Sequence, residues 1–176
     1  YKRQQINIPP TNKASIEAPP SNSDEEKVDY NTIITESFDD LNVKSTLLRG
    51  IYGHGYEVPS VIQQKAIKPL IDGRDVIAQA QSGTGKTATF SIGVLERIDE
   101  NLHATQAIIL AHTRELALQI DGVIKNISDY MNIKVNLSVG GTTVRNNIDE
   151  LLDNPHIVIG TPGRVLDMIN KKALNT

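Results

Sequence analysis

The sequence predicts an α/β domain in which helices cover both faces of a parallel β-sheet. After residue 35, short apolar runs that suit β-strands alternate with longer segments whose apolar residues recur at helical spacing. Repeated strand-then-helix units favour a parallel sheet, because each connecting helix packs back onto one of its faces. Hydrophobic residues make up 39% of the 176 residues, which is enough for a packed core.

Four apolar runs are the expected strands, at residues 75–78, 107–111, 135–139 and 157–159. Helices are expected over 41–51, from Ser60 to Gly73, from the Gly-rich turn after residue 80 to about Ile98, over 116–127, over 146–152 and after Thr161-Pro162. Ser, Thr and Pro suit helix starts, and Gly suits helix ends. Ligands of such sheets bind at the carboxyl ends of the strands, which is where the polar and Gly-rich segments of this sequence fall.

Residues 1–35 differ in composition from the rest of the chain. They hold four of the eight prolines, in the pairs Pro9-Pro10 and Pro19-Pro20, together with a short acidic run at 24–26. Such a stretch cannot bury enough apolar surface to offset the entropy that is lost on ordering. We therefore predict a disordered tail over 1–35, acting as a tether or binding a partner, and one domain over 36–176.

Composition excludes several classes of function. The net charge of −3 gives no overall positive field that would draw the chain onto nucleic acid, so any such binding depends on a few well-placed groups. The chain has no cysteine, which excludes disulfides and cysteine-based zinc sites. No apolar run approaches the roughly 20 residues of a membrane span, so no membrane partner is expected.

The clearest chemical signal is a Gly-rich loop between an expected strand and an expected helix. Glycines let backbone N–H groups point at a phosphate, and a helix N-terminus adds a favourable potential for an anion. Lys86 would reach the β- and γ-phosphates, and the Thr87 hydroxyl would hold Mg²⁺, which makes these two the catalytic candidates. The alternative is an ordinary turn, since the pattern usually begins with Gly rather than Ala80. The loop residues predicted to bind a nucleotide are Ala80, Gln81, Ser82, Gly83, Thr84, Gly85, Lys86 and Thr87.

A phosphate loop by itself fits an ATPase, a GTPase, a kinase or a helicase. GTPases usually carry an Asn-Lys-x-Asp element that binds guanine. The nearest string, at 170–173, lacks the Asp, so the sequence disfavours a GTPase.

The segment at 55–63 resembles the Q motif of DEAD-box RNA helicases. The resemblance implies that Gln63 recognises adenine through its amide, which can donate and accept hydrogen bonds at once. It also implies that Phe38 and Tyr56 belong to the ATP site. From the residues alone, Gln63 also fits a capping box with Ser60, and Phe38 also fits the core.

Three further segments resemble motifs that line the RNA path in the same family. They are Thr-Arg-Glu-Leu-Ala at 113–117, Gly-Gly at 140–141 and Thr-Pro-Gly-Arg at 161–164. The resemblance implies contacts to RNA phosphates and sugars, with little sequence preference. From the residues alone, Thr113 and Thr161 also fit helix caps, and the two glycines also fit a plain turn. His112 stands where the family has Pro, which we expect to leave the RNA contact less preorganised. The implied RNA-binding residues are Thr113, Arg114, Gly140, Gly141, Thr161, Gly163 and Arg164.

Together these segments make residues 36–176 similar to the N-terminal RecA-like domain of a DEAD-box helicase. Within that family, the sequence most resembles the initiation factor 4A subgroup. The resemblance implies an enzyme that hydrolyses ATP with Mg²⁺ and separates short RNA duplexes, in translation initiation or related messenger RNA metabolism. The family's Asp-Glu-Ala-Asp motif does not occur in the 176 residues. We therefore expect this chain alone to bind ATP and RNA weakly and to be inactive.

The resemblance also implies partners and a compartment. We expect RNA, contacted mainly through its backbone, together with scaffold or accessory proteins, and a monomeric state. The expected compartment is the cytoplasm, with the nucleus as the alternative. Two other function classes stay open at the level of sequence: another phosphate-loop ATPase or kinase, and an inert module that binds RNA or a protein partner.

Overall fold

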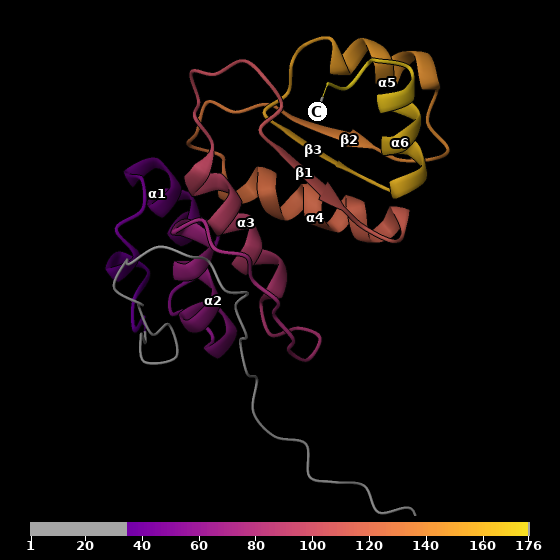
Figure 1. The fold of residues 1–176 in the computed structure, drawn as a ribbon. Coiled ribbons are helices and arrows are strands. Elements are labelled where there is room, and N and C mark those ends of the chain that lie inside the picture. Colours follow the sequence, from indigo (N-terminus) through magenta and orange to yellow (C-terminus); the bar gives the residue numbers. More distant parts are fainter. Residues whose placement is uncertain (1–34, 176) are drawn as a thin grey trace, which may run out of the picture.

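The computed structural model describes residues 35–175, so residues 1–34 of the tail predicted over 1–35 lie outside the described residues. Thr35 is 5% exposed, and the packed domain therefore includes the residue before the predicted boundary at 36. Figure 1 shows the helices and strands in order along the chain. They are η1 (Phe38–Leu41), α1 (Ser45–Gly53), α2 (Val61–Ile71), α3 (Lys86–Arg97), β1 (Ala107–Leu110), α4 (Arg114–Ile127), β2 (Val135–Ser138), α5 (Val144–Leu151), β3 (Ile157–Gly160) and α6 (Pro162–Asn170).

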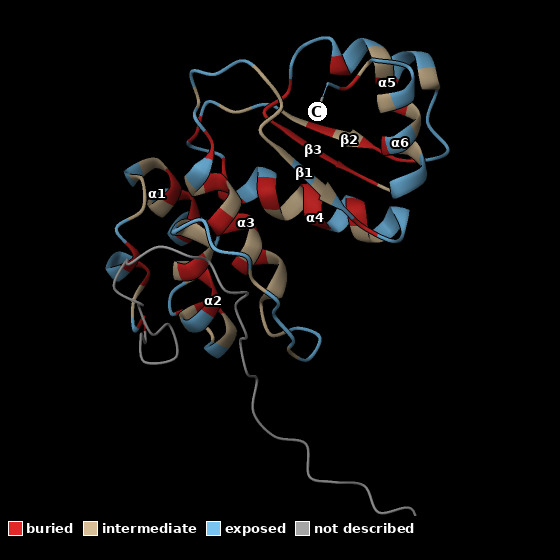
Figure 2. Ribbon diagram, in the orientation of Figure 1, coloured by how far each residue is buried: buried red, intermediate tan, exposed pale blue. Residues whose placement is uncertain are grey.

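The strands form a three-stranded parallel sheet in the order β1-β3-β2. In the register of the sheet, Leu110, Gly160 and Ser138 stand side by side as the last residues of their strands. The loops that follow the strands therefore leave from one edge of the sheet. All four residues of β3 are buried, because this strand lies between the other two and is covered on both faces (Figure 2).

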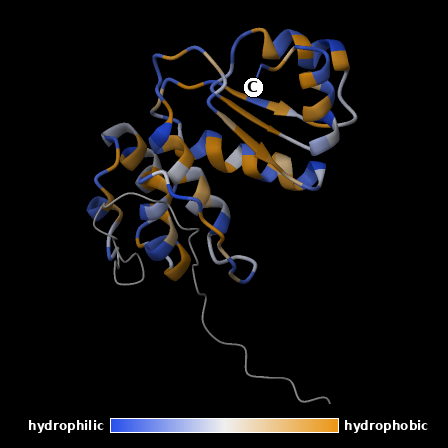
Figure 3. Cartoon of the chain, in the orientation of Figure 1, coloured by the Kyte–Doolittle hydropathy of each residue, from blue (hydrophilic) through white to orange (hydrophobic). Residues whose placement is uncertain are grey.

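Helices cover both faces of the sheet, as predicted. Ile157 and Ile159 of β3 belong to the main core, which they share with residues of α1, α3 and α4. Val158, between them, belongs to a second core with residues of α5 and α6. This alternation follows from the two-residue period of a strand. In Figure 3 the strands are largely coloured as hydrophobic, as expected for a sheet that is buried on both faces.

The expected helix over 41–51 is divided in two. Asn42 adopts a left-handed backbone conformation with φ 52°, which ends the short helix η1. The helix α1 begins three residues later, at Ser45. The apolar residues of both helices, including Phe38 and Leu47, still reach the main core.

The prediction of a strand at 75–78 is wrong. These residues belong to no helix or strand, and Ile77 is 84% exposed. A β-strand exists only where its backbone N–H and C=O groups pair with a neighbour. A cavity of about 560 Å³ has Val76 and Ala78 in its lining together with Ile108 of β1, so the segment and the strand face each other across a gap. Among the described residues, β1 consequently pairs with β3 alone.

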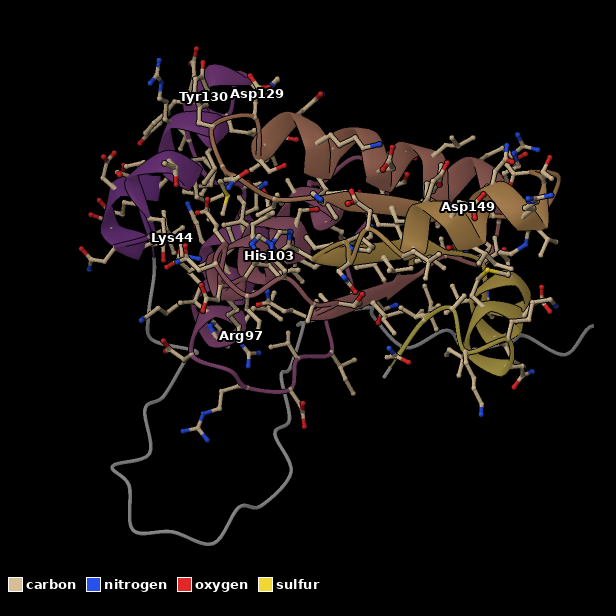
Figure 4. All side chains as sticks on the ribbon, turned by 90° about the horizontal axis from the view of Figure 1, so that it is seen from above. Lys44, Arg97, His103, Asp129, Tyr130 and Asp149 are labelled. Atoms are coloured by element: carbon tan, nitrogen blue, oxygen red, sulfur yellow. The ribbon has the colours of Figure 1, made fainter. Side chains whose placement is uncertain are left out.

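Two contacts hold α1 against α3 and against the segment that follows α4. The Lys44 ammonium donates to the carbonyl oxygens of Leu95 and Ile98, at 3.5 and 2.6 Å (Lys44 is labelled in Figure 4). The Arg49 guanidinium lies 4.1 Å from the ring centre of Tyr130. Helix α2 packs along α3, which brings the start of α2 beside the loop that precedes α3.

Candidate nucleotide and nucleic-acid sites

The predicted phosphate loop covers residues 80–85, and α3 begins directly after it, at Lys86. Gly83 and Gly85 have φ values of 79° and 93°, in the left-handed region that favours glycine. The Lys86 ammonium folds back and donates to the carbonyl oxygens of Ala80 and Gln81, each at 2.6 Å. An ammonium requires oxygen acceptors, and the loop's own carbonyl oxygens supply them here. Lys86 therefore lies against the loop at the N-terminus of α3.

The start of α2 contacts this loop directly. The Ser60 hydroxyl donates to the Thr84 carbonyl oxygen at 2.8 Å. The Gln63 side-chain oxygen accepts a hydrogen bond from the Ser60 backbone N–H at 2.7 Å, as the capping-box interpretation predicts. Gln63 is only 3% exposed, and a Cβ placed on Gly85 would lie 2.8 Å from its Nε2. Gln63 therefore caps α2 and lies against the phosphate loop at the same time.

The three other members of the predicted ATP site lie in different surroundings. Thr87 lines the 560 Å³ cavity together with Lys86. Phe38 is 0% exposed and packs edge-on against Tyr52, with 6.2 Å between ring centres, so the core-packing alternative describes its position. Tyr56 is half-buried beside the main core, and burial raises the pKa of its phenol. The structure therefore brings Thr87 to the loop and leaves Phe38 without exposed surface for a ligand.

A second, smaller cavity lies between the start of α2 and the phosphate loop. Its volume is about 360 Å³, and Ser60, Ile62, Gly83 and Thr84 are in its lining. The cavity thus adjoins both Ser60 of the helix cap and Gly83, one of the two left-handed glycines of the loop.

The side chains beside the loop suit Mg²⁺ that is already bound to a nucleotide. Thr87 is the second residue of α3, and its hydroxyl can supply one oxygen ligand. Within residues 35–175, no group of three or more His, Asp or Glu side chains could hold a metal ion by itself. Mg²⁺ usually keeps several waters and binds through one or two protein groups plus substrate phosphates, so one hydroxyl beside a phosphate loop suits it.

None of the described helices is both long and apolar enough to cross a membrane.

The three predicted RNA segments come together at the carboxyl edge of the sheet. Each begins within three residues of a strand end, and those ends are neighbours in the register. Thr113 caps α4, because its hydroxyl accepts from the Leu116 backbone N–H at 3.1 Å. Thr161 is the N-cap residue of α6 but makes no side-chain capping bond, so its hydroxyl is not used there. Gly163 is exposed in the first turn of α6.

Two guanidinium groups converge on the loop at 140–142. Gly141 has φ 84°, and a Cβ at this position would lie 2.5 Å from the Nη1 of Arg114, so glycine allows this close approach. Arg164 donates from Nη1 to the Thr142 hydroxyl and from Nη2 to the Thr142 carbonyl oxygen, both at 2.9 Å. Nη1 of Arg164 also lies 3.3 Å from the side-chain oxygen of Asn147. Positive charge is thus concentrated locally on a chain whose net charge is −3.

Sequence reasoning missed Thr142 and Asn147, which both hold Arg164 in place. The position of Thr142, directly after the two glycines, was the available signal. Asn147 carried no such signal, because its contact with Arg164 spans 17 residues and depends on how α5 and α6 pack together.

The sequence is similar to a family of helicases and to fungal members of it. The family model described as "DEAD/DEAH box helicase" matches residues 60–176. The "ATP-dependent RNA helicase eIF4A" of Meyerozyma guilliermondii is 58% identical over 156 residues, covering 85% of this chain and 39% of that protein. The protein of the same name from Coccidioides immitis is 54% identical over 166 residues, covering 94% of this chain and 41% of that protein. The chain therefore spans about two fifths of the length of these relatives.

The fold is similar to that of solved DEAD-box proteins. A DEAD box protein from Methanococcus jannaschii superposes with a TM-score of 0.77 and 39% identity, covering 81% of this chain and 39% of that chain. The Saccharomyces cerevisiae protein Dbp5, solved with RNA and ADP BeF3, gives a TM-score of 0.73 and 38% identity, covering 80% of this chain and 36% of that chain.

Proposed function

Because the chain belongs to the DEAD/DEAH box helicase family, we propose that it is the ATP- and RNA-binding half of an RNA helicase of the initiation factor 4A type. The chain spans 39% and 41% of the two fungal relatives, so hydrolysis and duplex separation are proposed for a longer protein that contains it. In that protein we expect ATP hydrolysis to drive the local opening of short RNA duplexes. The relatives' names favour a role in translation initiation.

One observation supports the nucleotide proposal most directly: Gln63 lies against Gly85 of the phosphate loop. An amide can read the adenine edge, and a loop of left-handed glycines followed by Lys86 and a helix N-terminus can hold the phosphates. The two elements are far apart in the sequence, and only the packing of α2 on α3 brings them together. Mg²⁺ bound by the nucleotide would gain the Thr87 hydroxyl as a ligand.

The RNA proposal is supported by the three loops at the carboxyl edge of the sheet. Arg114 and Arg164 approach the loop at 140–142, and the Thr161 hydroxyl at the start of α6 makes no capping bond. Charged groups and hydroxyls of this kind suit phosphates and sugars, and they carry little sequence information. We therefore expect RNA binding without strong sequence preference. Accessory proteins would then direct the helicase to its targets, and we expect a monomer in the cytoplasm.

Replacing Lys86 by alanine tests the nucleotide site. A hydrogen bond to a charged group contributes about 1.5–3 kcal/mol, so Lys86→Ala should weaken ATP binding by about 10- to 150-fold. Titration with a fluorescent ATP analogue measures the affinity. Lys171→Ala is the matched control, because Lys171 is exposed at the end of α6 and pairs with Asp167 there. ATP affinity that is equal in the two variants would contradict the proposed site.

The activity of the chain by itself is a second test. The Asp-Glu-Ala-Asp motif is not among its 176 residues, so we expect phosphate release close to background, with or without RNA. A sensitive assay of inorganic phosphate at saturating ATP and RNA measures this. ATP turnover that RNA stimulates in the purified chain would overturn the view that it is one part of the catalytic unit.

A further inference from the structure

A buried polar network lies behind the Arg164 guanidinium. Asn136, Ser138 and Asn147 are 5%, 0% and 2% exposed, although all three carry polar side chains. The side-chain oxygen of Asn147 accepts from Arg164 at 3.3 Å, and its Nδ2 donates to the side-chain oxygen of Asn136 at 3.5 Å. The Ser138 hydroxyl donates to the same oxygen of Asn136 at 2.8 Å. The amide of Asn147 is therefore held in one orientation, since each of its ends has a partner.

The network leaves the charge of Arg164 uncancelled. The other acceptors of Arg164 are the hydroxyl and the carbonyl oxygen of Thr142, which are also neutral. A guanidinium has five N–H donors, and three of them are used here, so two remain for a ligand. One carboxylate joins the network: Glu150 accepts a hydrogen bond from the Nδ2 of Asn136 at 2.9 Å, and it makes no such contact with Arg164. A guanidinium that is fixed in place but not neutralised suits a phosphate.

We propose that Asn147 is a positioning residue for RNA, which fixes Arg164 through a neutral amide so that the guanidinium meets a phosphate with its full charge. This inference rests on the proposed RNA-binding function, and it adds a residue of α5 that lies outside the three motif segments. A carboxylate at position 147 would keep the acceptor but cancel part of the charge. An apolar side chain would leave the charge and remove the acceptor. The two kinds of substitution therefore distinguish the effect of the Arg164 charge from the effect of the Arg164 orientation.

A double-mutant cycle tests the proposal in the 176-residue chain. A labelled uridine oligomer is titrated with Asn147→Leu, Arg164→Ala and the double variant, and fluorescence anisotropy gives each Kd. We expect Asn147→Leu to weaken RNA binding by about 2- to 10-fold, which corresponds to one net hydrogen bond. In the Arg164→Ala background the same change should have no further effect, because Asn147 acts through Arg164. Asn146→Leu, at the exposed neighbouring position of α5, is the matched control and should bind like the original chain.

Asn147→Asp keeps the test informative if the leucine variant folds poorly. Aspartate is nearly isosteric and retains an acceptor for Arg164, but it loses the Nδ2 donor to Asn136. We therefore expect a folded variant with a lower unfolding temperature than the original chain, and RNA binding is measured below that temperature. Its RNA affinity should fall, and the slope of log Kd against log salt should flatten by up to about 0.7, the contribution of one phosphate contact on a single strand. Unchanged affinity and slope in this variant would overturn the inference.

The remaining outcomes separate this inference from the proposed function. Suppose that Arg164→Ala weakens RNA binding, but Asn147→Leu lowers RNA affinity by the same factor in the Arg164→Ala background as in the original chain. The role of Asn147 is then only structural. If Arg164→Ala weakens binding and neither change at Asn147 does, the inference falls while the RNA site stands. If Arg164→Ala itself leaves RNA binding unchanged, both fall together.

Discussion

Replacing Gly85 by alanine tests whether the phosphate loop and Gln63 act as one site. Gly85 has φ 93°, and a Cβ there would lie 2.8 Å from Gln63 Nε2 and 3.3 Å from the Ser60 hydroxyl oxygen. The left-handed conformation costs an alanine about 1–2 kcal/mol, and displacing Gln63 from the Ser60 N–H loses a hydrogen bond of about 0.5–1.5 kcal/mol. We therefore expect Gly85→Ala to lower the free energy of unfolding by roughly 2–3 kcal/mol.

Gly83→Ala is the matched control for this change. Gly83 has φ 79°, and nothing lies within 4 Å of a Cβ built on it. The variant should therefore carry the backbone strain of about 1–2 kcal/mol without moving Gln63. Both variants should weaken triphosphate binding, because both distort the loop. Only Gly85→Ala should also reduce the preference for ATP over GTP, because only this change displaces the amide that we assign to adenine.

Two measurements decide the outcome. Urea unfolding gives the free energies, and competition of ATP and GTP against a fluorescent ATP analogue gives the base preference. If Gly83→Ala loses the preference for ATP as much as Gly85→Ala does, distortion of the loop alone explains the effect. If neither variant changes the preference, Gln63 does not read the base.

Two further predictions concern stability and titration. Gly160→Ala should lower the free energy of unfolding by about 2–4 kcal/mol, because its Cβ would lie 2.2 Å from the backbone oxygen of Ser138 on the neighbouring strand; an unchanged urea midpoint would contradict this pairing. A hydrogen bond from Tyr52, helped by Ser37, lowers the pKa of Asp39, so Tyr52→Phe should raise that pKa toward its ordinary value in an NMR titration of the carboxyl. Because the folded-state pKa is lowered, the stabilising contribution of this contact is present above the ordinary pKa of Asp and is lost as the pH falls through the lowered value. An Asp39 pKa that is equal in both proteins would exclude Tyr52 as the cause.

The sequence predicted the features that depend on local pattern. The three-residue spacing between Ser60 and Gln63 indicated a capped helix start, and the structure has the corresponding hydrogen bond at 2.7 Å. Thr161-Pro162 indicated the start of α6, which begins at Pro162. The convergence of the three RNA segments followed from a general property of parallel sheets, whose strands all end on one side.

Features that depend on distant partners could not be predicted in the same way. The run at 75–78 has the composition of a strand, but pairing requires a neighbouring strand, and the described residues supply none there. The sequence pattern does not separate η1 from α1, because the left-handed conformation of Asn42 has only a weak signature in sequence. The assignment of Phe38 to the ATP site came from resemblance, whereas its burial depends on the packing of the whole core.

Within residues 35–175 one edge of β1 has no partner strand, which affects how this chain behaves in concentrated solution. Its sequence is Ala-Ile-Ile-Leu, without the lysine, proline or bulge that commonly discourages one strand edge from joining another. Ile108 and Leu110 are 38% and 56% exposed beside the cavity. Two copies could therefore extend each other's sheets, and light scattering from the isolated chain should grow with protein concentration. Weak affinities for nucleotide and RNA are accordingly best measured in dilute samples.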